Sequence, residues 1–223
     1  NGVLTSDLQE QLRQQKGEIL HFVTQHNFAA QNNGSRSQQS IQPAPRTGAI
    51  PLSFAQQRLW FLAQLEGANA TYNLPSAFRL TGKLQLDALQ QALDTVVARH
   101  EILRTTFAVE ATTPFQIIAQ QQSVRLEFDD LSQLASEDQP KTMQHLIDSD
   151  AQQHFDLARG PLLHARLVRL SDEEHVLSLT LHHIISDGWS AGILMQELCT
   201  TYINTVQGRN TKLPLLTIQY ADY

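Results

Sequence analysis

Two adjacent histidines, His182 and His183, are the residues of this chain best suited to acid-base chemistry near neutral pH. They follow the apolar run 176–181, which predicts a strand, and they precede the turn residues Asp187 and Gly188. Beyond the turn, apolar residues recur at the spacing of a helix, at Ile193, Leu194, Leu198 and Tyr202. A strand, a polar turn and a helix form an arrangement in which α/β proteins place binding and reactive groups.

Successive residues of a strand point to opposite faces, so His182 and His183 cannot both serve one site while the backbone stays extended. We expect one histidine to face a substrate and the other to face the protein interior. Asp187 could pair with an imidazole or with a cation that stiffens the turn, and Arg58 is a candidate for that cation. Gly188 tolerates a positive φ and would let a ligand approach the backbone closely.

Two other interpretations of the histidine pair stay open at this point. The pair could be purely structural, as histidines at the end of a strand often are. It could also bind a metal ion together with Asp187, but adjacent histidines point apart and no further Cys, Asp or Glu stands at clear ligand spacing. We therefore predict no metal site.

Composition excludes several classes of protein. The chain has 223 residues, of which 41% are hydrophobic and 17% charged, so it can bury a sizeable core. The formal net charge of -6 and the lack of a basic cluster argue against a nucleic-acid partner. No apolar run is long enough to span a membrane, and the polar N-terminus lacks a signal-peptide core. The single cysteine excludes an intrachain disulfide, and we expect a cytoplasmic protein.

The sequence divides into three segments. Residues 1–29 contain an amphipathic helical pattern, which needs a partner surface to be stable. Residues 30–48 are rich in polar residues, Gly and Pro, which indicates a flexible linker. Residues 49–223 carry the pattern of a folded domain. The start at Asn1 rather than at a methionine suggests that the chain is part of something longer.

Helical and strand patterns interleave within the third segment, without repeated βαβ units. We therefore expect an α/β sandwich with a mixed or largely antiparallel sheet. The predicted elements are a helix from Ser53 as N-cap with apolar residues at 54, 55, 59, 62 and 65, a strand over 72–80, a helix over 87–100 with Asp87 as its cap, a hairpin over 103–118, a strand over 124–128, a helix over 141–155 and a hairpin over 162–182.

Four stretches taken together resemble, in order, the signature motifs of nonribosomal peptide synthetase condensation domains. They are SFAQQRLWFL (53–62), RHEILRTTF (99–107), LHHIISDGWS (181–190) and IQYADY (218–223). The resemblance implies a chloramphenicol-acetyltransferase-like lobe, here the N-terminal half of a two-lobed domain that surrounds a tunnel. The motif forms are most similar to domains that accept an L-configured donor. The segment 1–29 resembles the last helices of small docking domains.

By this resemblance, the activity is peptide-bond formation in the biosynthesis of secondary metabolites. A carrier-bound acyl or peptidyl thioester would react with the α-amine of a carrier-bound aminoacyl thioester. His183 would be the catalytic residue, either accepting the amine proton or orienting the amine and stabilising the tetrahedral intermediate. Asp187 would be structural and paired with Arg58, and His182 would be structural as well.

The resemblance also implies the surroundings of the site. Gly188 would leave room for the thioester, and Trp189 and Ser190 are candidate neighbours of the substrate, although core packing of Trp189 is an alternative. No cofactor would bind directly, because the substrates arrive on the 4'-phosphopantetheine of donor and acceptor peptidyl carrier proteins. An adjoining adenylation domain is implied, and an upstream synthetase subunit is a candidate partner for the N-terminal helix.

Three alternatives to this function remain. The fragment could be an inactive docking or interaction module that makes no bonds. It could also be a related coenzyme A-type acyltransferase, which uses a similar histidine turn, or an epimerisation domain, which shares the HHxxxDG pattern.

Overall fold

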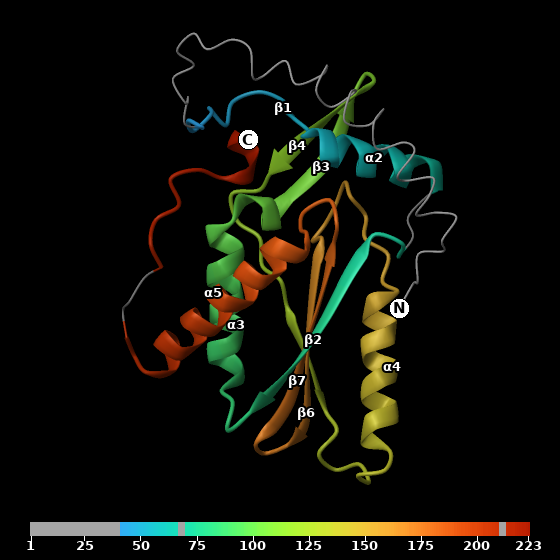
Figure 1. Ribbon diagram of the computed structural model, residues 1–223, viewed down its shortest axis with the longest axis vertical. Helices are drawn as coiled ribbons and strands as arrows, with labels where there is room; N and C mark the ends of the chain where they lie inside the picture. Colours follow the sequence, from blue (N-terminus) through green and yellow to red (C-terminus); the bar gives the residue numbers. More distant parts are fainter. Residues whose placement is uncertain (1–40, 67–69, 210–212) are drawn as a thin grey trace, which may run out of the picture. The chain divides into compact units, whose positions relative to one another are not determined.

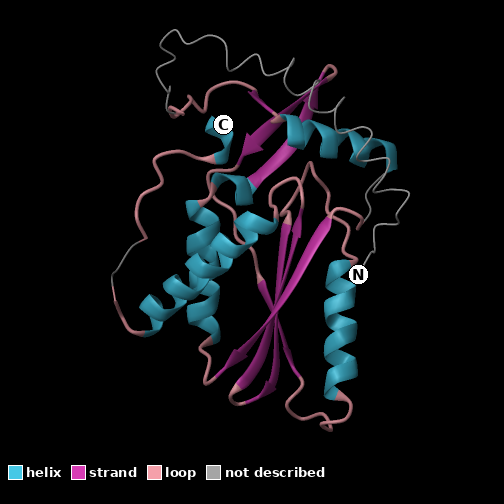
Figure 2. Ribbon diagram, viewed as in Figure 1, coloured by secondary structure: helices cyan, strands magenta, loops and turns pink. Residues whose placement is uncertain are grey.

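The computed structural model describes residues 41–223, apart from 67–69 and 210–212. The predicted helix within residues 1–29 lies outside these ranges, as do residues 30–40 of the predicted linker, so both stay predictions. The described chain forms two sheets with helices packed on them (Figures 1 and 2). None of the helices in the described part of the chain combines the length and the apolar character needed to cross a membrane.

The larger sheet has four strands in the order β2-β7-β6-β5. Strand β7 pairs antiparallel with β2 on one side and with β6 on the other, whereas β5 pairs parallel with β6. The predicted mixed, largely antiparallel sheet is therefore confirmed, and so is the hairpin that β6 and β7 form. The strands are β2 (Asn73–Thr81), β5 (Leu126–Asp130), β6 (Leu163–Ser171) and β7 (Glu174–His182).

Helices cover both faces of this sheet (Figure 1). Helices α3 (Leu86–Arg99) and α5 (Gly188–Val206) pack together over one face, where Leu177, Leu179 and Leu181 of β7 join their core. Helix α4 (Gln139–Ala151) lies on the other face and packs against a smaller apolar cluster that includes Val176. Every residue of β7 from 175 to 182 is buried as a result, so the histidine turn is attached to a strand that is fixed from all sides.

The smaller sheet consists of β1 (Ile50–Pro51), β4 (Thr113–Ile118) and β3 (Thr105–Glu110), in the order β1-β4-β3 and all antiparallel. The predicted hairpin over 103–118 is thus confirmed. Helix α2 (Phe54–Glu66) follows β1 along the chain. The predicted apolar face of this helix is only partly correct, because Phe54 is 91% exposed and Leu65 is 68% exposed.

Of the two helix caps predicted from the sequence, one is confirmed and one is wrong. The Ser53 hydroxyl accepts a hydrogen bond from the Gln56 N–H at 3.3 Å, so Ser53 is the N-cap of α2, as predicted. Asp87 is not a cap, because α3 begins one residue earlier and Gln85 stands at its N-cap. Asp87 instead lies in the first turn of α3, where a negative charge is favourable next to the positive end of the helix dipole.

Candidate active site

The two histidines at the end of β7 enter different environments. The His182 N–H donates to the carbonyl of Leu162 at 3.0 Å, and the His183 N–H donates to the carbonyl of Tyr72 at 2.8 Å, on the other side of β7. Because the two adjacent N–H groups point to opposite sides of β7, the backbone is extended at this point. The side chains of His182 and His183 therefore point to opposite faces of the sheet. His182 is buried, with 3% of its surface exposed, and His183 is exposed. The predicted division into an interior and an outward-facing histidine is therefore observed.

His182 is held as a neutral, structural side chain. Its ring centroid lies 6.3 Å from those of Tyr72 and Phe155, and its Nδ1 accepts a hydrogen bond from the Ile184 N–H at 3.1 Å. Burial, and secondarily the neighbouring His183, lower the pKa of His182 from 6.5 to about 4. A histidine that stays neutral and uses Nδ1 to fix the next residues supports the turn rather than moving protons.

The imidazole of His183 has one nitrogen bound and one nitrogen available. Its Nδ1 lies 2.7 Å from the carbonyl oxygen of Ser186. A carbonyl oxygen can only accept, so Nδ1 must carry a hydrogen and donate it. In the neutral ring, Nε2 then holds a lone pair and can accept a proton. The turn thus fixes both the orientation of the ring and the tautomer that a general base requires.

Asp187 caps α5. Its Oδ1 accepts a hydrogen bond from the Ser190 N–H at 2.8 Å, while the Ser190 hydroxyl accepts one from the Asp187 N–H at 2.8 Å. Hydrogen bonding from Ser190, its backbone N–H first, lowers the pKa of the Asp187 carboxyl, which keeps it charged at the positive end of the helix. The Ser190 hydroxyl also lies 3.1 Å from that of Ser186. Ser190 is therefore engaged in holding the turn that carries His183.

The predicted ion pair between Asp187 and Arg58 is absent among the described residues. No ion pair there includes either side chain, and Arg58 is exposed on α2. The physical reason is the cap, because the Asp187 carboxylate already receives backbone N–H groups at the start of α5. The hydrogen-bond partners of Asp187 belong to its own helix, and its predicted structural role stays a prediction.

A cavity of about 530 Å³ opens beside the histidine turn. One wall is α2, which contributes Arg58, and the other is the turn that carries His183. The described ranges contain no group of three or more His, Cys, Asp or Glu side chains placed to hold a metal ion. The lining residues are Ala55, Gln56, Arg58, Leu59, Leu62, Tyr72, Ile102, residues 183–187, Trp189, Ser190 and Tyr220.

Trp189 and Gly188 stand at the start of α5. Trp189 lines the cavity and is 81% exposed, so the alternative that it packs in the core is wrong. Gly188 does not use a positive φ, and a Cβ added there would meet no atom within 4 Å. The expected conformational need for glycine at this position is therefore absent, while the open space beside it is present.

Gln56 is a site residue that was not predicted from the sequence. It is 1% exposed, and its Nε2 lies 3.4 Å from Oε1 of Gln116 and 3.5 Å from the carbonyl oxygen of Ile184. Its Oε1 accepts a hydrogen bond from the Ser53 N–H at 3.0 Å. The signal was available, because a Gln three residues after a Ser at a helix start is a capping box. Gln56 thereby joins α2 to the histidine turn.

The second motif connects the end of α3 to α5 and to Gln219 of the fourth motif. Arg99 and His100, at the end of α3, both contact Glu197 of α5, with His100 Nε2 2.6 Å from the carboxylate. The backbone N–H of Glu101 donates to Oε1 of Gln219 at 3.0 Å. The fourth motif is thus fixed to the second, although more than 100 residues separate them in the sequence.

Residues 46–223 match a family model described as the condensation domain. The chain belongs to the condensation-domain family. Chondramide synthase cmdD from Chondromyces crocatus is 44% identical over 181 residues, which cover 81% of this chain and 5% of that protein. Malpibaldin synthetase from Mortierella alpina is 44% identical over 206 residues, which cover 90% of this chain and 4% of that protein. The condensation-domain chain therefore spans a small share of these relatives.

Solved structures confirm the predicted fold class of this condensation domain. The complex of the X-domain and OxyB from teicoplanin biosynthesis matches with a TM-score of 0.73 and 35% identity, over 85% of this chain and 40% of that one. The first condensation domain of the CDA synthetase matches with a TM-score of 0.70 and 26% identity, over 75% of this chain and 43% of that one. The described lobe thus corresponds to less than half of each matched chain.

Proposed function

We propose that this condensation domain forms peptide bonds in nonribosomal peptide synthesis. It transfers an acyl or peptidyl group from a carrier-bound thioester to the α-amine of a carrier-bound aminoacyl thioester. The observation that carries the proposal is the contact between His183 Nδ1 and the Ser186 carbonyl, because it makes Nε2 the basic nitrogen of a ring that lines the cavity.

The proposed reaction needs little beyond proximity, orientation and a proton acceptor. The amine nitrogen attacks the thioester carbonyl carbon, and His183 Nε2 accepts the proton that the nitrogen loses. The carbon–sulfur bond then breaks, and the imidazolium returns the proton to the departing sulfur as a thiol. In a second version of this role, His183 orients the amine by a hydrogen bond and stabilises the tetrahedral intermediate. Asp187, His182 and Ser190 hold the turn in either version.

The substrates and partners follow from the same proposal. Donor and acceptor carrier proteins present their thioesters on 4'-phosphopantetheine arms, and an adenylation domain in the same protein loads the amino acid. The relatives support this environment, since one is named as phosphinothricin tripeptide synthetase PhsC, 40% identical over 176 residues. The donor is L-configured, as the motif forms suggest, and the segment 1–29 contacts an upstream synthetase subunit.

A second lobe completes the cavity in this proposal. Trp189, which lines the cavity, is 81% exposed, and Phe54 at the start of α2 is 91% exposed, and large apolar side chains are costly to leave in water. The partial coverage of the matched condensation domains supports the same arrangement. Gly188 leaves room for the thioester beside the turn, and Trp189 contacts the substrate.

A single-turnover condensation assay tests the proposal, with donor and acceptor thioesters on carrier proteins and the synthetase that contains this chain. We expect His183→Ala to lower the rate by about 100-fold or more, because it removes the proton acceptor. His145→Ala is the matched control, since His145 lies on α4, away from the cavity lining. Turnover of His183→Ala near that of the control would refute the catalytic role, and no product from the unaltered protein would favour an interaction module.

A further inference from the structure

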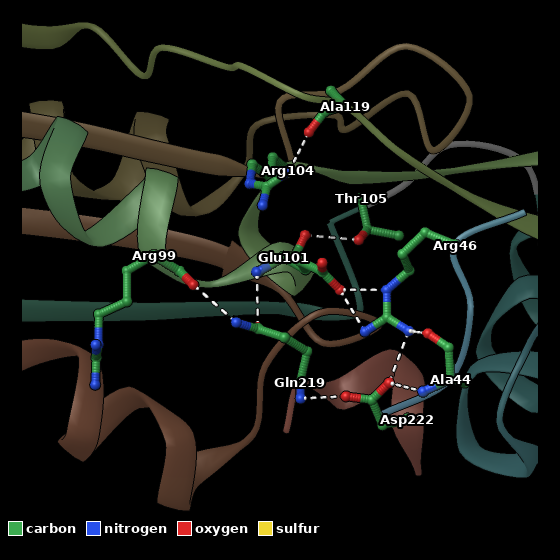
Figure 3. Close-up of polar contacts among 9 residues, drawn as sticks. All are labelled: Ala44, Arg46, Arg99, Glu101, Arg104, Thr105, Ala119, Gln219 and Asp222. Carbon is green, nitrogen blue, oxygen red and sulfur yellow. Dashed lines mark hydrogen bonds and ion pairs between the residues drawn. The ribbon is translucent and has the colours of Figure 1, made fainter. Parts of the chain in front are cut away.

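Arg46, Glu101 and Asp222 form a cluster of ion pairs, here called the ionic clasp, between segments that are far apart in the sequence (Figure 3). Arg46 donates from Nε to Glu101 Oε2 at 2.8 Å and from Nη1 to Asp222 Oδ1 at 2.7 Å. Its Nη1 also donates to the carbonyl oxygen of Ala44 at 2.8 Å. Arg46 belongs to the predicted linker 30–48, so the last residues of that segment are attached to the folded unit.

Asp222 is the buried member of the clasp. Its side chain is 2% exposed, and it accepts hydrogen bonds from the N–H groups of Ala44 at 2.9 Å and Gln219 at 2.6 Å, in addition to Arg46. These donors, with Arg46 first, hold the pKa of Asp222 well below its ordinary value. A buried carboxylate that loses its cation keeps an uncompensated charge, so the position of residues 219–222 depends on Arg46.

Tyr220 connects the clasp to the cavity. This residue lies within the short helix Tyr220–Asp222, and it lines the cavity that contains His183. The Tyr220 hydroxyl lies 2.8 Å from the hydroxyl of Ser53, which is the N-cap of α2. An unbroken series of contacts therefore leads from Arg46 through Asp222 and Tyr220 to the first turn of α2, which is one wall of the cavity.

We infer that Arg46, Glu101 and Asp222 are positioning residues of the His183 cavity, which act by holding Tyr220 against the first turn of α2. The kinetic part of this inference rests on the proposed function, whereas the structural part does not. The histidine turn has its own support in β7 and in the α5 cap, so the clasp sets the wall that faces His183 rather than the histidine itself. Residues 44–46, at the start of the folded unit, are thereby coupled to the shape of the cavity.

Amide hydrogen exchange in the full-length protein tests the structural part. Arg46→Ala should raise exchange by about tenfold or more at residues 219–223 and in the first turn of α2, and leave residues 182–187 unchanged. Arg46→Lys should restore part of the protection, because a lysine keeps the charge but lacks the planar fork that contacts both carboxylates. Tyr220→Phe should raise exchange only at the start of α2, since it removes a single hydroxyl.

Arg79→Ala is the matched control, because Arg79 forms an ion pair with Glu174 at the opposite end of β2 and β7 from the histidine turn. It should leave exchange at the cavity unchanged. In the condensation assay, Arg46→Ala and Tyr220→Phe should raise KM for the thioesters by about tenfold with an unchanged pH profile of kcat.

Each outcome decides the inference. If the amides at the start of α2 stay protected from exchange in both Arg46→Ala and Tyr220→Phe, the inference is wrong. The clasp would then only attach residues 44–46 to the folded unit. If Arg46→Ala fails to fold, Arg46→Lys and Tyr220→Phe still decide the coupling. A protein without condensation activity in any form would refute the proposed function alone, because the exchange experiment would still report on the clasp.

Discussion

The side chain of Gln56 and the carbonyl of Ile184 join α2 to the histidine turn at a contact of 3.5 Å between Nε2 and the oxygen. The same nitrogen also faces Gln116, whose own amide donates to the carbonyl of Pro51 at 2.8 Å. The buried amide of Gln56 thus connects α2 to the histidine turn within the lining of the cavity.

Replacing Gln56 by leucine should lower the free energy of unfolding by about 1 to 3 kcal/mol, because buried polar partners of the amide lose their hydrogen bonds. Urea denaturation measures the change. Gln64→Leu is the control, since Gln64 is exposed on the same helix and should change stability by less than about 0.5 kcal/mol. Equal effects of the two substitutions would show that the Gln56 contacts contribute nothing to stability.

The buried His182 should make stability depend on pH. Its pKa falls from 6.5 to about 4 on folding, so the unfolded chain binds a proton between these values that the folded chain does not. The contribution of His182 to the free energy of unfolding should therefore be fully present above pH ~6.5 and fall by about 3 kcal/mol as the pH drops toward 4. Denaturation at several pH values measures this loss. His182→Gln, which keeps an acceptor for the Ile184 N–H, should flatten the curve, and an unchanged slope would contradict the assignment.

Arg58 should contribute little to stability. It is exposed and has no ion pair among the described residues, so Arg58→Ala should change the free energy of unfolding by less than about 0.5 kcal/mol. Arg46→Ala, which leaves the buried Asp222 without its cation, should have the larger effect on the melting temperature. A loss of several kcal/mol for Arg58→Ala would instead indicate that Arg58 and Asp187 pair in solution.

Gly188 has no positive φ that would require glycine, so a substitution there can test whether its small size leaves space for a substrate. Gly188→Ala and Gly192→Ala both place a methyl group where no atom lies within 4 Å, on the same helix. Both should keep or slightly raise the melting temperature, because alanine favours a helix over glycine. Only Gly188→Ala should lower condensation, by about tenfold, because the proposed function assigns the space next to Gly188 to the thioester. Equal activity of the two variants would remove Gly188 from the site.

Patterns among neighbouring residues predicted the helices and strands well. The alternation in β6 and β7 indicated their hairpin, and the apolar spacing of α3 and α5 indicated two helices, because each pattern reflects one local period. The divergence of His182 and His183 followed from strand geometry in the same way.

Contacts between distant segments could not be read from local patterns. Asp187 was predicted to pair with Arg58, but the nearer backbone of α5 satisfies that carboxylate. The contacts of Arg46 with Asp222 and of Gln56 with Ile184 were not predicted, and they join residues 176 and 128 positions apart. Such pairs depend on tertiary packing, and the periodicity of apolar residues does not predict which distant residues come into contact.

The cavity has two walls of different origin, and this has a consequence for protein engineering. The imidazole of His183, the proposed proton acceptor, follows β7, which is buried from residue 175 to 182, while Ala55, Arg58, Leu59 and Leu62 of the facing wall all come from α2. Grafting the outward side chains of this one helix from a relative should retune the substrate range without disturbing the proton acceptor. We therefore expect that, under the proposed function, selectivity and reactivity can be engineered separately, provided that Ser53 and Gln56 are kept.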